Sequence, residues 1–158
     1  MDLNEKKNEL LSQIDELVLE YYKTVHSSKK EFSPGSRIPY AGRVFDEKEL
    51  TELVHSGLEF WLTSGNYTER FEKGLADYLE VPFCSFVNSG SSANLLAFMT
   101  LTSPLLGERA ISRGDEVITV ACGFPTTVSP IVQYGAVPVF VDVTIPEYNV
   151  DVKELEKA

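Results

Sequence analysis

The stretch best suited to chemistry is NSGSSAN at residues 88–94, which joins an expected strand to an expected helix. The first amides of a helix have no partner within it and are partly positive, so a helix N-terminus attracts anions. Gly90 leaves room for a ligand beside the backbone, and Ser91 and Ser92 add hydroxyl donors. These three residues are expected to bind a phosphate, with a serine-rich helix cap as the alternative. The pattern is neither a P-loop nor GxGxxG.

A second candidate follows the next expected strand, in ACGFPTT at residues 121–127. Open α/β sheets bind ligands at the carboxyl ends of their strands, so Phe124 is expected at the same edge as the serine-rich turn. An aromatic ring there could stack on a flat heterocycle, and packing in the core is the alternative. Together the two loops predict a site for a phosphorylated aromatic ring.

The order of the expected elements predicts an α/β fold that follows a helical segment. Helices are expected at 3–25, from 46 onward and at 68–80; strands at 82–87, 117–120 and 138–143; and further helices at 91–102 and 125–134. Asp2 with Glu5, and Asp46 with Glu49, resemble capping boxes at the starts of the first two helices, and Pro125 suits the first turn of the last helix. The apolar side chains of the helix at 68–80 are expected to face inward: Phe71, Leu75, Tyr78 and Leu79. Strands that alternate with helices at this spacing predict parallel pairing with right-handed crossovers. Because the strands are apolar throughout, a parallel-rich sheet with helices on both faces is expected. Residues 1–66 form the helical segment and residues 67–158 the first part of the α/β domain.

Composition excludes several classes of partner and site. A net charge of −10 over 158 residues argues against a nucleic-acid partner, because binding phosphates requires clustered Lys and Arg. The one local basic pair, Lys29-Lys30, is expected to be solvated. No apolar run approaches the roughly 20 residues that span a bilayer, and the acidic N-terminus is not a signal peptide. Cys84 and Cys122 are expected to be reduced core residues of a cytoplasmic protein, and no metal site is expected. His26 and His55 are expected on helix surfaces.

The end of the sequence suggests that a longer protein continues beyond it. Asp151 followed by Glu154 has the pattern of a capping box, which predicts that a helix starts close to the last residue, Ala158. The expected strands also leave the edges of the sheet unpaired. We therefore expect the chain to be the N-terminal part of a larger domain.

Several motifs, in this order, resemble one known family. They are FWLTSGNYTERFEKGLADYL, NSGSSANLLAF, RGDEVITVACGFPTT and QYGAVPVFVDVTIPEYNVD. They resemble the DegT/DnrJ/EryC1/StrS sugar aminotransferases, which have the fold-type-I architecture of pyridoxal-phosphate enzymes. The stretches TSPLLGERAI and IPEYNV are most similar to those of the CDP-4-keto-6-deoxy-glucose 3-dehydrases, a lipopolysaccharide-biosynthesis branch of the family. The resemblance implies the N-terminal part of the large domain of such an enzyme.

The resemblance assigns roles to the candidate positions. It places the cofactor phosphate at Gly90, Ser91 and Ser92, the pyridine ring on Phe124, and the nucleotide sugar near Thr63, Ser64 and Gly65. For Gly65 a simple break between helices is the alternative. The implied cofactor is pyridoxamine 5'-phosphate or pyridoxal 5'-phosphate.

The resemblance also implies what lies downstream of these residues. The catalytic Asp and the Lys that binds the cofactor covalently are C-terminal in the family, and His replaces that Lys in the dehydrases. Asp142 is therefore expected to be a cap or turn residue. The [2Fe-2S] ligands of the dehydrases are also C-terminal, which excludes Cys84 and Cys122 as ligands.

As implied partners, the resemblance gives a CDP-sugar substrate, a reductase and a second copy of the full-length chain in a homodimer. The chain alone is expected to be inactive. The alternatives are a pyridoxal-phosphate sugar aminotransferase and a non-enzymatic phosphate-binding module.

Overall fold

The structure, a computed structural model, describes residues 2–28 and 32–158, so Lys29 and Lys30 lie outside the described residues. The chain forms two compact units, Met1–Phe71 and Glu72–Ala158. The boundary expected between residues 66 and 67 concerns the domains of the whole protein and stays a prediction.

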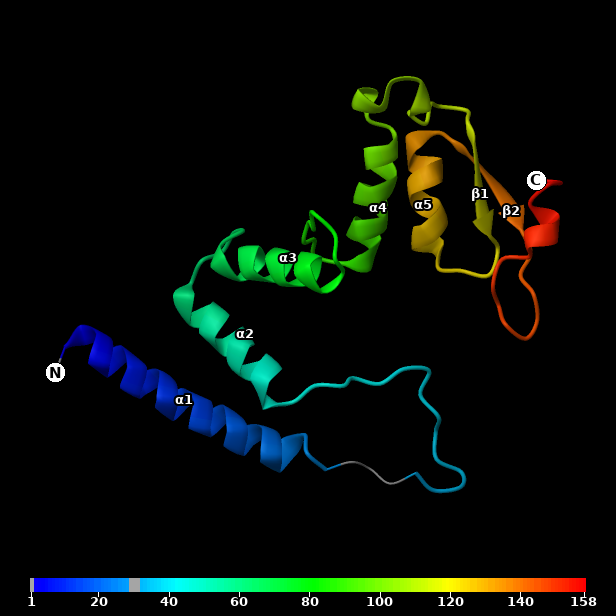
Figure 1. Cartoon of the computed structure of the whole chain (residues 1–158). Coiled ribbons are helices and arrows are strands. Elements are labelled where there is room, and N and C mark those ends of the chain that lie inside the picture. Colours follow the sequence, from blue (N-terminus) through cyan, green and yellow to red (C-terminus); the bar gives the residue numbers. More distant parts are fainter. Residues whose placement is uncertain (1, 29–31) are drawn as a thin grey trace. The chain divides into compact units, whose positions relative to one another are not determined.

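The first unit consists of helices whose starts follow from local capping chemistry (Figure 1). Helix α1 is Leu3–Val25, α2 is Glu47–Glu59, and α3, Asn66–Tyr78, contains the boundary between the units. Asp2 and Asp46 each close a capping box with the Glu three residues later, as expected. Each box satisfies amides that have no partner within the helix.

Two polar contacts join α1 to α2 and to Phe45, two residues before α2. The Tyr22 hydroxyl donates to the Phe45 carbonyl at 3.2 Å, and His55 Nε2 lies 2.7 Å from Asp15 Oδ1. The prediction that His55 is a surface residue was therefore wrong, because it is half-buried and links two helices. His26 does lie exposed, at the C-terminal end of α1.

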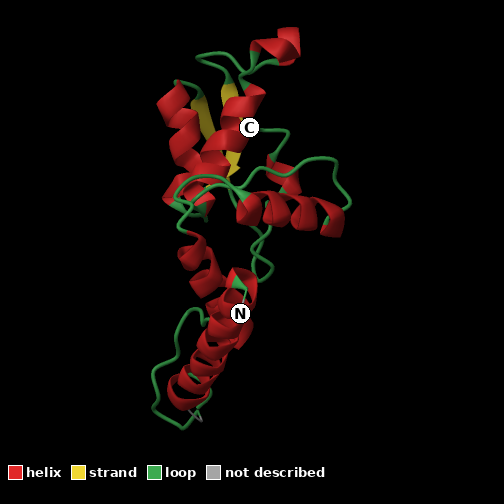
Figure 2. Cartoon of the chain, turned by 90° about the vertical axis from the view of Figure 1, so that its left-hand side faces the viewer, coloured by secondary structure: helices red, strands yellow, loops and turns green. Residues whose placement is uncertain are grey.

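The second unit is a parallel α/β unit. Its elements are α4 (Gly90–Leu101), β1 (Glu116–Val120), α5 (Pro125–Tyr134) and β2 (Val137–Val141), with short 3-10 helices at Pro104–Arg109 and Val152–Glu154. β1 pairs with β2 in parallel, with Ile118 opposite Val139. Figures 1 and 2 show α4 and α5 on the same side of this strand pair. The expected helix–strand–helix–strand order and the parallel pairing are thus confirmed.

A small core holds the second unit together. Phe98 on α4 packs with Ile131 on α5 and with Ala136, and Val117 and Tyr134 lie against them. The Phe98 and Tyr134 rings meet edge to face with their centroids 6.1 Å apart. Such aromatic pairs add about 0.5–1.5 kcal/mol beyond burial, so this contact helps to hold α4 against α5.

The strand expected at 82–87 does not form. This segment is a loop with a bend at Pro82, and among the described residues the sheet consists of β1 and β2 alone. The amide of Phe86 instead donates to Glu72 Oε1 at 2.7 Å. Likewise the helix expected from Asp151 is only a 3-10 turn, with Asp151 accepting from the Lys153 amide.

Several side chains that were expected to be buried are exposed. On and beyond α3, Phe71, Tyr78 and Leu79 are 48%, 82% and 55% exposed, so their predicted inward direction was wrong for this chain. Both thiols are free, but Cys122 is exposed rather than part of a core, and Cys84 is half-buried. Because β1 and β2 are the only strands in the described part, little apolar surface is available to cover these groups.

Asp142 directly follows β2 and precedes the isolated bridge between Val143 and Val150, so the expectation that it is a cap or turn residue was wrong. Its Oδ1 accepts from the Val143 amide at 2.8 Å, and its carbonyl accepts from the Asp151 amide at 2.9 Å. Within the described residues, no helix is both long and apolar enough to cross a membrane.

Candidate functional site

The turn that opens α4 is built around Ser89. Ser89 has an extended backbone, and its Oγ accepts a hydrogen bond from the Ser92 amide at 3.2 Å. The Ser92 hydroxyl in turn donates to Asn88 Oδ1 at 2.7 Å. These contacts fix the turn before any ligand arrives, and Asn88 is a residue to which the sequence alone gave no role.

Ser91 and Ser92 therefore differ in what they can offer a ligand. The proton of the Ser92 hydroxyl is already directed to Asn88, so Ser92 braces the turn. Ser91 is exposed, and its hydroxyl has no hydrogen-bond partner among the described residues. A Cβ built on Gly90 would meet no atom within 4 Å, so the space beside this glycine is open. The Ser92 and Ala93 amides already donate to Ser89, so among the described residues the free donors are the Ser91 hydroxyl and the amides of Gly90 and Ser91.

Phe124 lies at the start of α5 and is accessible. It is the residue before Pro125, which occupies the first helical position as expected. The Phe124 side chain is 77% exposed, so the alternative of core packing does not hold in this chain. A ring so exposed can offer a face to a flat ligand.

The structure brings the two loops to the same end of the second unit. α4 and α5 run side by side, and their N-termini lie together near the carboxyl end of β1 (Figure 1). Asn94 Nδ2 on α4 donates to the Thr126 carbonyl on α5 at 3.4 Å, which ties the two starts together. Gly90, Ser91, Ser92 and Phe124 thus share one edge, as the sequence indicated.

The donor set fits a phosphorylated ring. The N-terminus of α4 supplies partly positive amides, Ser91 supplies a hydroxyl, and Phe124 supplies an apolar face. The arrangement can bind and orient a phosphorylated heterocycle.

The other predicted site residues, Thr63, Ser64 and Gly65, lie in the first unit between α2 and α3. The indole Nε1 of Trp61 donates to the Ser64 carbonyl at 2.9 Å and closes this turn. A Cβ on Gly65 would lie 2.5 Å from Trp61 Cδ1, so glycine is required for the ring to sit there. Thr63 and Gly65 line a small polar hollow of about 80 Å³, together with Tyr67.

Tyr67 was not singled out from the sequence. Burial raises the pKa of its phenol above the ordinary value for tyrosine; the nearby carboxylates of Glu59 and Glu52 raise it further, and Arg70 opposes them. The guanidinium of Arg70 lies 5.3 Å from the centre of the Tyr67 ring. Tyr67 therefore stays a hydrogen-bond donor at neutral pH.

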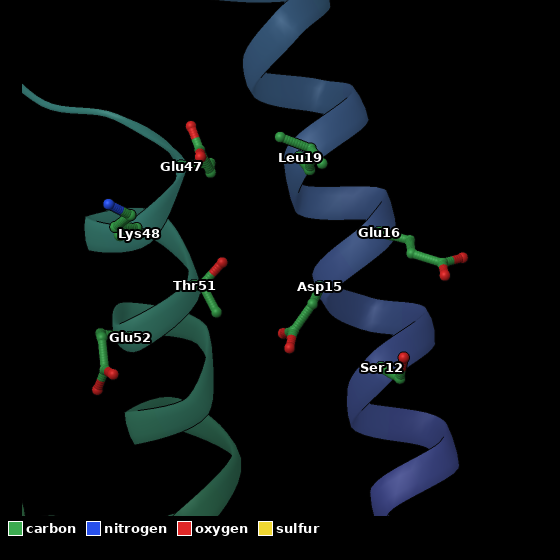
Figure 3. A pocket seen from close by; sticks show the side chains of 8 residues that line it. All are labelled: Ser12, Asp15, Glu16, Leu19, Glu47, Lys48, Thr51 and Glu52. Atoms are coloured by element: carbon green, nitrogen blue, oxygen red, sulfur yellow. The ribbon is translucent and has the colours of Figure 1, made fainter.

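A larger hollow lies between α1 and α2, with a volume of about 440 Å³ (Figure 3). Its lining is mostly acidic or neutral: Ser12, Asp15, Glu16, Leu19, Glu47, Lys48, Thr51 and Glu52. Carboxylates outnumber the single Lys48 in this lining, so a phosphate would be repelled. This hollow is not a candidate for the predicted site.

Within the described residues, no group of three or more His, Cys, Asp or Glu side chains is arranged to hold a metal ion.

The chain is similar in sequence to a known family and to several known proteins. Residues 43–158 match the model of the DegT/DnrJ/EryC1/StrS aminotransferase family. The chain is 50% identical over 151 residues to the lipopolysaccharide biosynthesis protein RfbH of Salmonella typhimurium, covering 96% of this chain and 35% of that protein. It is 51% identical over 109 residues to the dTDP-4-dehydro-2,6-dideoxy-D-glucose 3-dehydratase of Saccharopolyspora spinosa, covering 69% of this chain and 24% of that protein.

The fold has solved counterparts. A crystal structure of a GDP-4-keto-6-deoxymannose-3-dehydratase with a trapped PLP-glutamate geminal diamine superposes with a TM-score of 0.67 at 31% identity, covering 77% of this chain and 31% of that one. The chain spans about a quarter to a third of the length of these relatives. Since the family model matches 43–158, most of the sequence, the chain belongs to the DegT/DnrJ/EryC1/StrS aminotransferase family.

Proposed function

We propose that this chain is the cofactor-phosphate-binding part of a cytoplasmic, pyridoxamine-phosphate-dependent nucleotide-sugar 3-dehydratase. The observation that supports this most is the paired start of α4 and α5, where an anion-binding turn lies beside an exposed aromatic ring. When bound, the cofactor supplies an electron sink for loss of the hydroxyl at the sugar C3. The names of the two similar curated proteins support sugar dehydration in lipopolysaccharide or deoxysugar synthesis.

In this proposal the described residues bind and orient. The Ser91 hydroxyl and the first amides of α4 hold the phosphate, Ser92 and Asn88 keep the turn rigid, and Phe124 covers one face of the ring. The Thr63–Gly65 turn, with Trp61 and Tyr67, contacts the nucleotide sugar. We propose CDP-4-keto-6-deoxy-glucose as the substrate, on the resemblance of the TSPLLGERAI and IPEYNV stretches. The [2Fe-2S] centre, the reductase and the homodimer belong to the whole protein.

The binding half of the proposal is tested with the protein expressed from its complete gene. Ser91→Ala removes a hydrogen bond to a dianion, which is worth about 1.5–3 kcal/mol, so pyridoxamine phosphate should bind about tenfold more weakly or worse. Ser92→Ala should weaken binding less, because that hydroxyl acts through the turn. Ser103→Ala, beyond the far end of α4, is the control. Unchanged affinity in Ser91→Ala, measured by spectroscopic titration, would remove the turn from the site.

The reaction half distinguishes dehydration from amine transfer, the activity that gives the family its name. In a dehydratase the cofactor exchanges on dialysis after borohydride treatment, and the oxygen at C3 exchanges with solvent. Borohydride fixation of the cofactor to a lysine, with a 4-amino sugar as product, would establish the aminotransferase instead.

A further inference from the structure

Helix α5 contains a proline that leaves one carbonyl without its usual donor. Pro130 lies inside the helix and is buried. A proline has no amide hydrogen, so it cannot donate to the carbonyl four residues earlier, and its ring also crowds that carbonyl. In α5 that carbonyl belongs to Thr126, in the first turn of the helix and two residues after Phe124.

Asn94 of α4 supplies the missing donor from outside the helix. Its Nδ2 donates to the Thr126 carbonyl at 3.4 Å, which is long for such a bond. Asn94 and Phe98 are four residues apart, so they share the face of α4 that meets α5. Phe98 packs against Tyr134 near the far end of α5. The two helices are therefore joined at one end by an aromatic pair and at the other by this hydrogen bond.

From this arrangement we infer that Asn94 is a positioning residue. It sets the spacing between the Gly90–Ser92 turn at the start of α4 and Phe124 at the start of α5. The inference rests on the proposed function, in which these two starts hold the phosphate and the ring of one cofactor. Phosphate alone needs only the α4 turn. Loss of the Asn94 bond should therefore impair binding of the ring much more than binding of phosphate.

The test uses the protein expressed from its complete gene and three variants. Asn94→Leu has nearly the same shape but no donor, and leucine favours a helix more than asparagine does. Asn94→Leu combined with Pro130→Ala returns an amide donor to the Thr126 carbonyl without restoring the link between the helices. Thr100→Ala is the control, because it removes a hydroxyl bond to Leu96 within α4 alone.

Each variant is measured for thermal unfolding, for binding of pyridoxamine phosphate and of inorganic phosphate, and for the circular dichroism induced in the bound cofactor. Asn94→Leu should raise the Kd for pyridoxamine phosphate three- to tenfold and at least halve the induced signal, while the Kd for inorganic phosphate stays within twofold. The double variant should recover thermal stability but not the induced signal. Thr100→Ala should match the parent in binding and in the induced signal.

Several outcomes overturn the inference. Parental binding and induced signal in Asn94→Leu would show that the bond does not position the ring. An equal loss of both ligands would place the role of Asn94 in the phosphate turn alone. Full recovery of the induced signal in the double variant would mean that Asn94 only satisfies a carbonyl. If the parent binds neither pyridoxamine phosphate nor pyridoxal phosphate, the proposed function fails and this inference fails with it.

Discussion

The Trp61–Gly65 turn gives the sharpest test of the structure without any ligand. In Gly65→Ala the new Cβ would lie 2.5 Å from Trp61 Cδ1 and 2.7 Å from Nε1, well inside normal carbon contacts of about 3.5–4.0 Å. The Trp61 side chain is 67% exposed, so the ring can swing away. That movement breaks the 2.9 Å bond from its Nε1 to the Ser64 carbonyl.

Two opposite contributions to the free energy of unfolding determine which measurement can detect the change. Losing the hydrogen bond costs about 0.5–1.5 kcal/mol, whereas replacing glycine by alanine stabilises by about 0.4–1 kcal/mol through the unfolded chain. The two effects nearly cancel, so the free energy of unfolding changes little. The position of the ring is the better readout. Since the sequence contains one Trp, its fluorescence reports this turn directly.

Gly65→Ala should shift the Trp61 emission to longer wavelength and raise its rate of quenching by acrylamide. Gly57→Ala is the matched control in α2, because a Cβ there meets no atom within 4 Å. It should leave the emission unchanged and add about 0.5–1 kcal/mol of stability, as expected for glycine in a helix. A Gly65→Ala variant with parental emission and quenching would refute the packing of Trp61 on Gly65.

Three further predictions address local features. Asp46→Ala removes both the acceptor for the Lys48 amide and the capping box, so α2 should lose about 1 kcal/mol, seen as faster amide exchange in its first turn; unchanged exchange would contradict this. The pKa of Tyr67 is raised, so its phenolate should form at higher pH than that of a free tyrosine. The stability that the neutral phenol contributes is present at neutral pH and is lost as the pH rises through the raised pKa, and the absorbance difference between the parent and Tyr67→Phe checks it. The 158-residue chain by itself should self-associate through exposed groups such as Phe83 and Ile118, 88% and 47% exposed, and a concentration-independent monomer in sedimentation would contradict this.

Features set by a few neighbouring residues were predictable from the sequence. The capping boxes at Asp2 and Asp46 formed as expected, and α5 begins at Pro125. Each depends on hydrogen bonds or backbone angles within about four residues, so no knowledge of the rest of the fold was needed. The parallel order of β1 and β2 followed from the helix between them.

The failures concern contacts with residues far along the chain. The segment 82–87 has the composition of a buried strand, but a strand needs a partner, and none is present among the described residues. The inward side of α3 was also expected from its apolar spacing, yet Tyr78 is exposed because no layer of the described residues covers it. Periodicity identifies which face is apolar and does not say what covers it.

The candidate site depends both on local sequence and on contacts between residues far apart in the chain. The sequence PTTVSP already implies that Thr126 loses its donor to Pro130, since that relation depends only on a spacing of four residues. It does not reveal that the donor is Asn94, 32 residues away, because that depends on how α4 packs on α5. Phe98 and Tyr134 contribute to that packing, and neither was a candidate for the site. The spacing between the phosphate turn and Phe124 is thus a property of the core, so core substitutions at Phe98 or Tyr134 act on the same distance that Asn94 sets.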